Sequence, residues 1–222
     1  LKYLYGAAFR STGISSLYFP ASLIACSADI IYCNNLEEYI VDPNCTCLKS
    51  IDGVLYNYEA TTLIHYPDAK LDETFVVPNT VNTINSYAFN GSKMKNLVLS
   101  SSLMYMYGHS NFEGLTSIDW NGCQLASICG YALSGLSCDE LVIPNTIKSF
   151  DQFAFSNAVC NKLYIPSSLK NIYKQAFKNL IVTEVHYDGT VEEFTSISKT
   201  ETAFDDAPFT EVICSNGSFI IE

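Results

Sequence analysis

The sequence is poor in positive charge. Only 12 of its 222 residues are Lys or Arg, whereas 23 are Asp or Glu, so the formal net charge is −11. A chain of this charge repels the phosphate backbone of nucleic acid and an anionic membrane surface, and neither is expected as a partner. Charged residues form only 16% of the chain and apolar residues 48%, which predicts a folded protein rather than a disordered one.

Long hydrophobic runs are also missing. No apolar stretch is long enough to cross a bilayer, so no direct membrane insertion of this chain is expected. The opening residues, LKYLYGAAF, do not have the organisation of a signal peptide. Because they start in the middle of a repeat, we expect a fragment of a longer protein, and the missing targeting signal says little.

Recognisable catalytic and metal-binding patterns are absent from the sequence. The three histidines, His65, His109 and His186, have no Cys, Asp or Glu at the spacing of a catalytic triad or a ligand set. Cys45 and Cys47 are close enough in sequence to share a metal, but no second pair completes a zinc site. We therefore predict a protein that is not an enzyme, with no catalytic residues, no metal and no cofactor.

The nine cysteines show no regular disulfide framework. Cys138 and Cys160 occupy positions where other parts of the chain have Ile, Leu, Met or Val. We interpret them as buried free thiols that pack as small hydrophobic side chains. If the two positions stack at the spacing of neighbouring strands, a bridge between them is geometrically conceivable, and that alternative stays open.

What the sequence does contain is a motif that returns about every 22 residues. An apolar residue is followed three residues later by a second and five residues later by a third. The cleanest copies are Cys138-x-x-Leu141-x-Ile143 and Cys160-x-x-Leu163-x-Ile165. A period of this length is typical of stacked supersecondary units, which present a long continuous surface.

One unit illustrates the predicted local structure. Residues 141–143 alternate apolar positions and favour a short strand, which Pro144 ends because proline cannot continue a sheet ladder. Ile147 and Phe150 follow at a spacing of three, and we interpret them as a return segment of turns or short 3₁₀ helix. A small-then-large pair, Ala154-Phe155 in this unit, is expected to fill the space between neighbouring turns. One apolar column recurs every 22 residues, at Ile84, Met106, Ile128, Phe150 and Ile172.

Two segments depart from the period. Residues 48–74 are predicted to form an inserted β-hairpin of two strands, one before and one after residues 58–60. The repeat resumes at Phe75. Residues 192–222 lose the motif and are predicted to cap the open end of the stack. Residues 1–191 would then form an array of about eight rungs.

The repeated phrases resemble a known family. IPNTIKSFDQFAF (143–155), IPSSLKNIYKQAF (165–177) and VPNTVNTINSYAF (77–89) are similar to BspA-type leucine-rich repeats. SIDGVLYNYEATTLIHYP (50–67) resembles the hairpin that interrupts many of those arrays, and HYDGTVEEFTSIS (186–198) their C-terminal ending. The resemblance implies an α/β-type repeat solenoid, a right-handed leucine-rich-repeat superhelix with short parallel strands on its concave side. It also implies a cell-surface or secreted protein, and several such proteins are adhesins.

Alternation along each predicted strand places every second side chain outside. These outward residues are the candidate contacts for a protein partner: Tyr18, Ile40, Val76, Val98, Asp119, Val142, Tyr164 and His186, with Glu140, Lys162 and Glu184 beside them. An apolar middle with polar margins is typical of a protein-binding surface. The alternative is that Val and Ile occupy these positions only because they favour extended backbone.

The function expected from these features is binding of a protein partner, such as a host matrix or cell-surface protein, in adhesion to host or neighbouring cells. Periodicity alone supports a binding scaffold, and the surface location follows from the resemblance. Two alternatives remain, namely an intracellular protein-interaction scaffold and a passive spacer for a domain outside this sequence.

Overall fold

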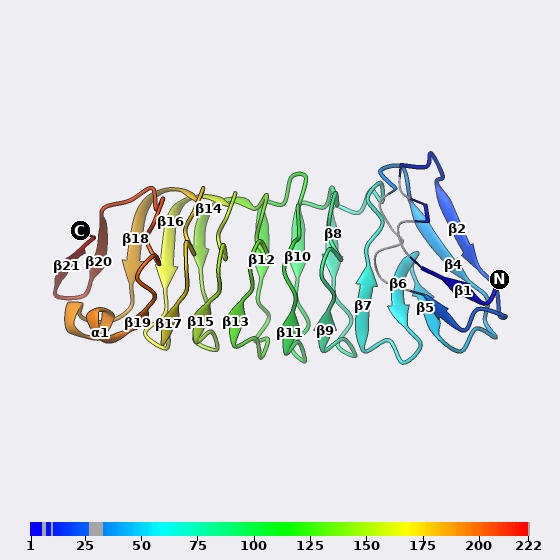
Figure 1. The fold of residues 1–222 in the computed structure, drawn as a ribbon, viewed down its shortest axis with the longest axis horizontal. Coiled ribbons are helices and arrows are strands. Elements are labelled where there is room, and N and C mark those ends of the chain that lie inside the picture. The colour runs from blue at the N-terminus through cyan, green and yellow to red at the C-terminus, as the bar shows by residue number, and fades with distance from the viewer. Residues whose placement is uncertain (6–7, 10, 27–32, 222) are drawn as a thin grey trace.

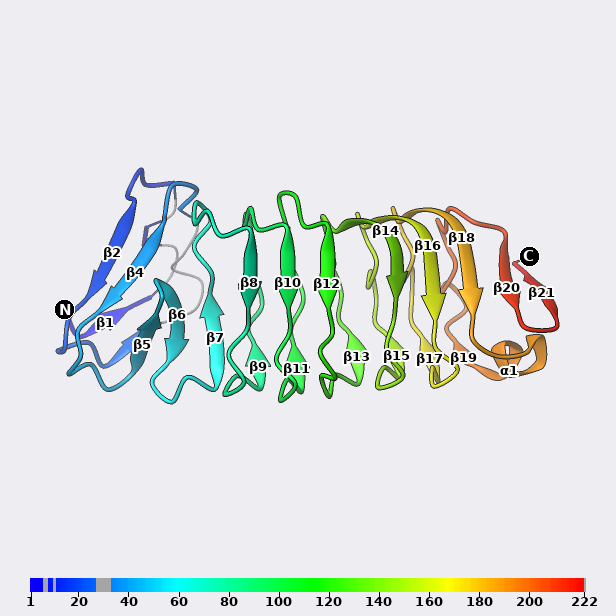
Figure 2. The ribbon, with the colours of Figure 1, turned by 180° about the vertical axis from the view of Figure 1, so that it is seen from behind.

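The computed structural model describes residues 1–5, 8–9, 11–26 and 33–221. The chain winds into an elongated solenoid of about eight turns, with its two termini at opposite ends (Figures 1 and 2). Most turns contribute one strand to each of two opposite walls, which we call the front wall and the back wall. Short strands of this kind have no stable core of their own, so neighbouring turns must supply it.

The front wall consists of parallel strands of three to seven residues. Its strands are β2 (Ser16–Phe19), β4 (Glu38–Val41), β8 (Thr74–Val76), β10 (Asn96–Val98), β12 (Ser117–Asp119), β14 (Ser137–Val142), β16 (Val159–Ile165) and β18 (Ile181–Tyr187). Leu141 pairs with Leu163, and Leu163 pairs with Val185, so the predicted apolar column faces the core in register.

The back wall corrects the prediction for the return segments, which form short strands instead of 3₁₀ helix or turns alone. These strands are β1 (Tyr3–Leu4), β3 (Ala25–Cys26), β7 (Thr62–His65), β9 (Thr83–Ile84), β11 (Tyr105–Met106), β13 (Ser127–Ile128), β15 (Ser149–Phe150), β17 (Asn171–Ile172) and β19 (Ser198–Lys199). The predicted 22-residue column is confirmed, because Ile128, Phe150 and Ile172 are register partners. Two residues per turn suffice for a strand here, since neighbouring turns satisfy their backbone hydrogen bonds.

Helix is almost absent, so the α/β-type description of the fold is not confirmed. Within the described residues the single helix is α1 (Val191–Ser196). Its N-terminus carries a capping box, in which the Thr190 hydroxyl accepts from the Glu193 backbone N–H and the Glu193 carboxylate accepts from the Thr190 N–H. The fold is therefore a β-solenoid.

The insertion contains three strands where the sequence predicted two. β5 (Leu48–Ile51) and β6 (Val54–Asn57) form a tight antiparallel hairpin, and β6 then pairs antiparallel with β7. Asp52 and Gly53 make the tight turn with φ values of 49° and 77°. Because β7 also pairs in parallel with β9, the insertion joins the back wall and does not break it.

The core consists largely of Leu, Ile and Val side chains and contains a stack of aromatic rings beside small residues. Phe155 and Phe177 stack with ring centroids 5.5 Å apart, and Phe177 stacks on Phe204 at 5.7 Å. Ala154 and Ala176 beside them are fully buried, as expected for residues that let neighbouring turns approach. Burying each Phe contributes roughly 1.5–3 kcal/mol.

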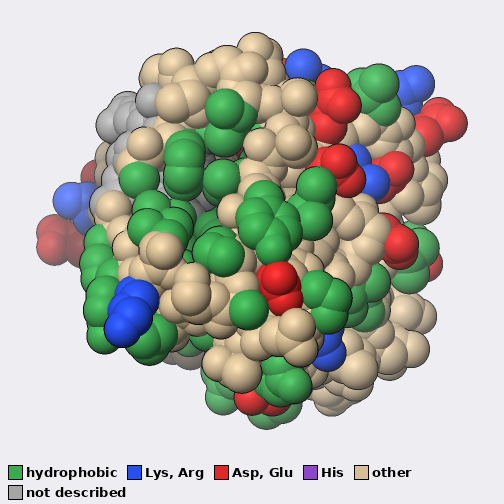
Figure 3. All heavy atoms as spheres, turned by 90° about the vertical axis from the view of Figure 1, so that its right-hand side faces the viewer, with side chains coloured by type: hydrophobic (Ala, Val, Ile, Leu, Met, Phe, Trp, Pro, Cys, Tyr) green, Lys and Arg blue, Asp and Glu red, His purple; other side chains and the backbone are tan. Residues whose placement is uncertain are grey.

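The two ends of the solenoid differ. At the C-terminus, α1 and the antiparallel hairpin of β20 (Glu211–Cys214) and β21 (Gly217–Ile220) cover the stack, and Phe194 of α1 is fully buried. Figure 3 looks onto the N-terminal end, where hydrophobic side chains gather on the surface. Leu1, Tyr3 and Ile24 are exposed there. In the described part of the chain, no helix has both the length and the hydrophobicity needed to span a membrane.

Candidate partner-binding surface

The predicted outward residues lie side by side on the front wall. We call them the front stripe, which consists of Tyr18, Ile40, Val76, Val98, Asp119, Val142, Tyr164 and His186. Tyr18 pairs with Ile40 in β2 and β4, and Val98 lies between Val76 and Asp119 in β8, β10 and β12. Val142, Tyr164 and His186 are partners in β14, β16 and β18. All eight are exposed or partly exposed, which fits the predicted inward and outward alternation.

The front stripe has three segments and is not one continuous row. β2 and β4 form one sheet, β8, β10 and β12 a second, and β14, β16 and β18 belong to a third. The β5–β6 hairpin turn lies against β4, where the Gly53 carbonyl accepts from the Tyr39 N–H at 2.8 Å. The break between β4 and β8 coincides with the predicted insertion, whereas sequence periodicity did not predict the break between β12 and β14.

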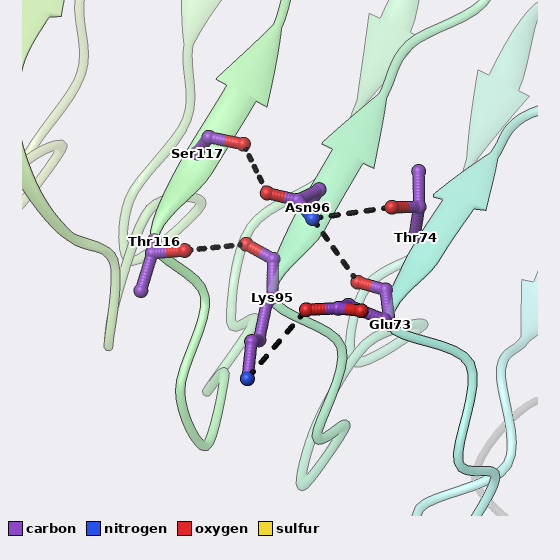
Figure 4. A network of polar contacts seen from close by, with 6 residues as sticks. All are labelled: Glu73, Thr74, Lys95, Asn96, Thr116 and Ser117. Atoms are coloured by element: carbon purple, nitrogen blue, oxygen red, sulfur yellow. Dashed lines mark hydrogen bonds and ion pairs between the residues drawn. The ribbon is translucent and has the colours of Figure 1, made fainter.

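Polar side chains beside the middle segment bond to one another (Figure 4). The Ser117 hydroxyl donates to Asn96 Oδ1 at 2.7 Å, and Asn96 Nδ2 donates to the Thr74 hydroxyl at 3.1 Å. In the same network, Lys95 Nζ lies 3.6 Å from Glu73 Oε1. This ladder crosses three strands and fixes the orientation of its side chains, so it stiffens the edge of the surface.

The C-terminal segment has a charged flank. Glu140, Lys162 and Glu184 are register partners on β14, β16 and β18. Glu184 Oε2 lies 2.8 Å from His186 Nε2 and 3.7 Å from Lys162 Nζ. The hydrogen bond from His186, together with the Lys162 charge, lowers the pKa of the Glu184 carboxyl below its usual value. Glu140 makes no ion pair with any described residue, and its described hydrogen bond, from the Tyr164 hydroxyl, is long at 3.5 Å.

Tyr164 and His186 form the one stacked ring pair within the front stripe. Their ring centroids are 5.0 Å apart and their planes are inclined by 23°. On the other side of Tyr164 the register partner is Val142, which is 57% exposed. The row thus changes from aromatic to small side chains at this point, and the surface is open above Val142.

A groove of about 580 Å³ opens at the C-terminal ends of β14, β16 and β18, and we call it the end groove. Its apolar and aromatic lining includes Val142, Pro144, Tyr164, Pro166, His186 and Ile213. Ile213 belongs to the cap strand β20, which pairs with β18 through His186. Sequence reasoning missed this wall, because the period has already ended where β20 begins.

A second column of stacked rings, which sequence reasoning also missed, follows the back-wall strands β9, β11, β13 and β15. His109 stacks between Tyr87 and Tyr131, with centroid distances of 5.0 and 5.2 Å, and Tyr131 is 5.2 Å from Phe153. All four residues have φ near +60°, a left-handed conformation unusual for aromatic residues. The signal available in the sequence was their constant 22-residue spacing.

The remaining predicted chemistry resolves as follows. The register partners Cys138 and Cys160 are not joined by a disulfide; Cys160 is buried and Cys138 is partly buried. Burial raises the pKa of the Cys160 thiol to about 12. Cys45 Sγ and Cys47 Sγ are 3.6 Å apart. Over the described ranges, no three His, Cys, Asp or Glu side chains are grouped as metal ligands would be. His65 is buried between the walls, away from the front stripe.

Solved structures share this architecture. A leucine-rich cell surface protein from Faecalibacterium prausnitzii is 22% identical with a TM-score of 0.75, over 89% of this chain and 54% of that one. A leucine-rich repeat protein from Eubacterium ventriosum is 20% identical with a TM-score of 0.63, over 98% and 67%. The pneumococcal vaccine antigen PcpA is 22% identical with a TM-score of 0.75, over 100% and 60%. The chain thus spans between about half and two thirds of these proteins, and the likeness shows the fold.

The family model gives the more specific result. No curated protein matches the sequence. The model of the BspA type leucine rich repeat region matches six copies over residues 66–182, which is more than half of the chain and includes most of the front and back walls. On the evidence of these six copies and the stacked turns that they form, the chain belongs to the BspA-type leucine-rich-repeat family.

Proposed function

We propose that this chain is a non-enzymatic, surface-exposed binding protein that attaches to a protein partner through the front stripe, in adhesion to host or neighbouring cells. The observation that carries the proposal is that parallel strands hold the exposed side chains in register within each of the three segments of the front stripe. Tyr18, Val76 and Val142 each leave more than half of their surface in water, and exposed apolar side chains that gather on one surface mark interaction sites.

The physics of the surface favours a macromolecular partner. The strands hold the front stripe rigidly, so little conformational entropy is lost when a partner binds. Apolar side chains occupy the middle of the stripe and polar side chains its margin, which is the arrangement of protein interfaces. Leucine-rich-repeat proteins generally bind proteins, and the family is generally non-enzymatic.

The solved relatives support a surface location for this chain. The Faecalibacterium protein is described as a cell surface protein and the pneumococcal protein as a vaccine antigen. We extend that location, at the cell surface or secreted, to this chain as part of the proposal. The partner would be a host matrix or cell-surface protein.

Attachment of protein-coated beads tests the proposal. Beads carrying the chain are expected to adhere to cultured epithelial cells or to matrix-coated glass. The triple variant Val142→Asp, Tyr164→Ala, His186→Ala should reduce adhesion by about tenfold or more, since clustered aromatic contacts dominate protein interfaces. The matched control is Tyr105→Ala with Tyr107→Ala, which removes two exposed tyrosines in and beside β11 of the back wall.

The outcomes separate the alternatives. Equal adhesion by the triple variant and the control would contradict binding through the front stripe. No adhesion by any version would favour a passive spacer. If the beads bind only intracellular proteins, and the full-length protein stays inside its cell, the intracellular protein-interaction scaffold would be favoured.

A further inference from the structure

We infer that the end groove recognises an arginine side chain in an extended segment of the protein partner. The inference rests on the proposed function, and it assigns the chemistry of the partner at one place. Four features carry it: the shape of the groove, its unpaired carboxylates, the open face of the Tyr164 ring, and the wall contributed by β20.

The groove has the shape of a site for a side chain and a short length of backbone. It follows the ends of three parallel strands, and Ile213 of β20 closes it on the cap side. Pro144 and Pro166 lie along it and have no N–H to offer, so the rim resists pairing with a further strand. An extended segment that projects one long side chain into the groove fits this geometry better than a folded domain.

The charge of the groove is one-sided. Glu140 and Asp188 line it, and no Lys or Arg of the described chain does. Neither carboxylate is in an ion pair with a described residue, because Lys162 is paired with Glu184 outside the groove. A cationic group therefore finds two carboxylates that form no ion pair with a described residue, on a protein whose net charge is −11.

The ring of Tyr164 favours arginine over lysine. His186 covers one face of this ring at 5.0 Å, and the other face looks along the row toward Val142, a short side chain. A planar guanidinium above Val142 would stack on that open face as the next layer of the column. Glu140 lies in the same turn as Val142 and already reaches the Tyr164 hydroxyl, so its carboxylate is placed to accept two hydrogen bonds from the guanidinium. A lysine ammonium gains no comparable stacking.

Selection of peptides tests this inference with a defined probe. Short random linear peptides displayed on phage are selected against the immobilised whole chain, and the enriched sequences are synthesised. We expect arginine to recur at one position. Replacing that arginine with citrulline, which has the same shape without the charge, should weaken binding by about tenfold or more, as loss of a charge-assisted hydrogen bond does.

Variants of the chain locate the site. Glu140→Gln combined with Asp188→Asn, and separately Tyr164→Ala, should each weaken the peptide by about tenfold. Glu201→Gln combined with Asp205→Asn is the matched control for the double variant, since it removes two negative charges at exposed residues outside the groove and should leave binding unchanged. Equal binding of the citrulline peptide, equal binding by the double variant and the control, or failure to obtain any arginine-bearing peptide would each overturn the inference.

The result also distinguishes this inference from the proposed function. Peptides that lose binding with Val142→Asp but tolerate citrulline would overturn arginine recognition while leaving the front stripe as a binding surface. If instead bead adhesion is unaffected by the triple front-stripe variant and no selected peptide responds to it, both the inference and the proposed function are wrong.

Discussion

The hydroxyl of Tyr39 lies 2.9 Å from Nδ1 of His65, and the two rings meet edge to face. Tyr39 comes from β4 of the front wall and His65 from β7 of the back wall, so this contact joins the two walls across the insertion. Both side chains are at most 2% exposed. His65 Nε2 in turn lies 3.5 Å from Asp68 Oδ1, which extends the contact into a buried polar chain of three residues.

The first prediction concerns Tyr39→Phe. The substitution keeps the ring and removes the hydroxyl, which leaves a buried imidazole nitrogen without its partner. We expect a loss of about 1–3 kcal/mol in the free energy of unfolding, measured by urea denaturation. Tyr105→Phe is the control and should change little, because Tyr105 is 53% exposed. Equal losses for the two variants would mean that the buried hydrogen bond contributes nothing.

The second prediction concerns pH and Asp68. Burial, helped by the charge of Glu113, raises the pKa of the Asp68 carboxyl to about 7, so the folded chain holds a proton that the unfolded chain releases near pH 4. Stability from this group is therefore present at low pH and is lost as the pH rises through 7. Burial lowers the pKa of His65 to about 3, so its contribution has the opposite sign and is complete above the unfolded value of about 6.5.

Above pH 6.5, therefore, the titration of Asp68 still changes the free energy of unfolding, whereas that of His65 does not. Between pH 6.5 and 8 we expect the chain to lose about 1 kcal/mol that Asp68→Asn does not lose. At lower pH, between about 4 and 6.5, the two groups oppose each other in the unaltered chain, whereas the stability of Asp68→Asn should rise with pH. Parallel stability profiles for the two proteins across this range would contradict the assignment.

The period of the sequence predicted the stacking and the register, because each turn repeats the same inward positions. Leu141, Leu163 and Val185 therefore met as expected. The back-wall strands could not be predicted from one unit, since a two-residue strand exists only when the neighbouring turns pair with it. The Asp52-Gly53 dipeptide is a strong signal for a tight hairpin, but the prediction did not use it and therefore gave the insertion two strands instead of three.

The surface was predicted in part. Alternation identified the front stripe, because outward positions follow directly from the strand period. The end groove was not predicted, since its wall comes from Ile213, a residue of the cap that pairs with β18 outside the repeat. The break between β12 and β14 was not predicted either, because the motif gives no sign of where the ladder hydrogen bonds stop. Whether the stripe binds a partner stays a prediction.

The third prediction uses the close approach of neighbouring turns at Gly130. A Cβ atom there would lie 2.4 Å from the backbone oxygen of Gln152 in the next turn, which cannot move without shifting the wall. We expect Gly130→Ala to cost about 1–3 kcal/mol. Gly13→Ala is the matched control, because its Cβ would meet only the end of the Asn35 side chain at 4.0 Å. Thermal unfolding of both variants measures the difference, and a Gly130 variant as stable as the control would rule out the tight contact.

The last prediction tests the orientation of the front wall itself. Leu141 is 2% exposed and Val142 is 57% exposed, although they are neighbours on β14. Leu141→Asp places a carboxylate between two turns with no cation to pair with it, and should cost about 3–5 kcal/mol, enough to unfold the middle of the array. Val142→Asp leaves its carboxylate in water and should cost less than about 1 kcal/mol. Because the two variants carry the same charge one residue apart, equal losses in melting temperature would mean that the wall faces the other way.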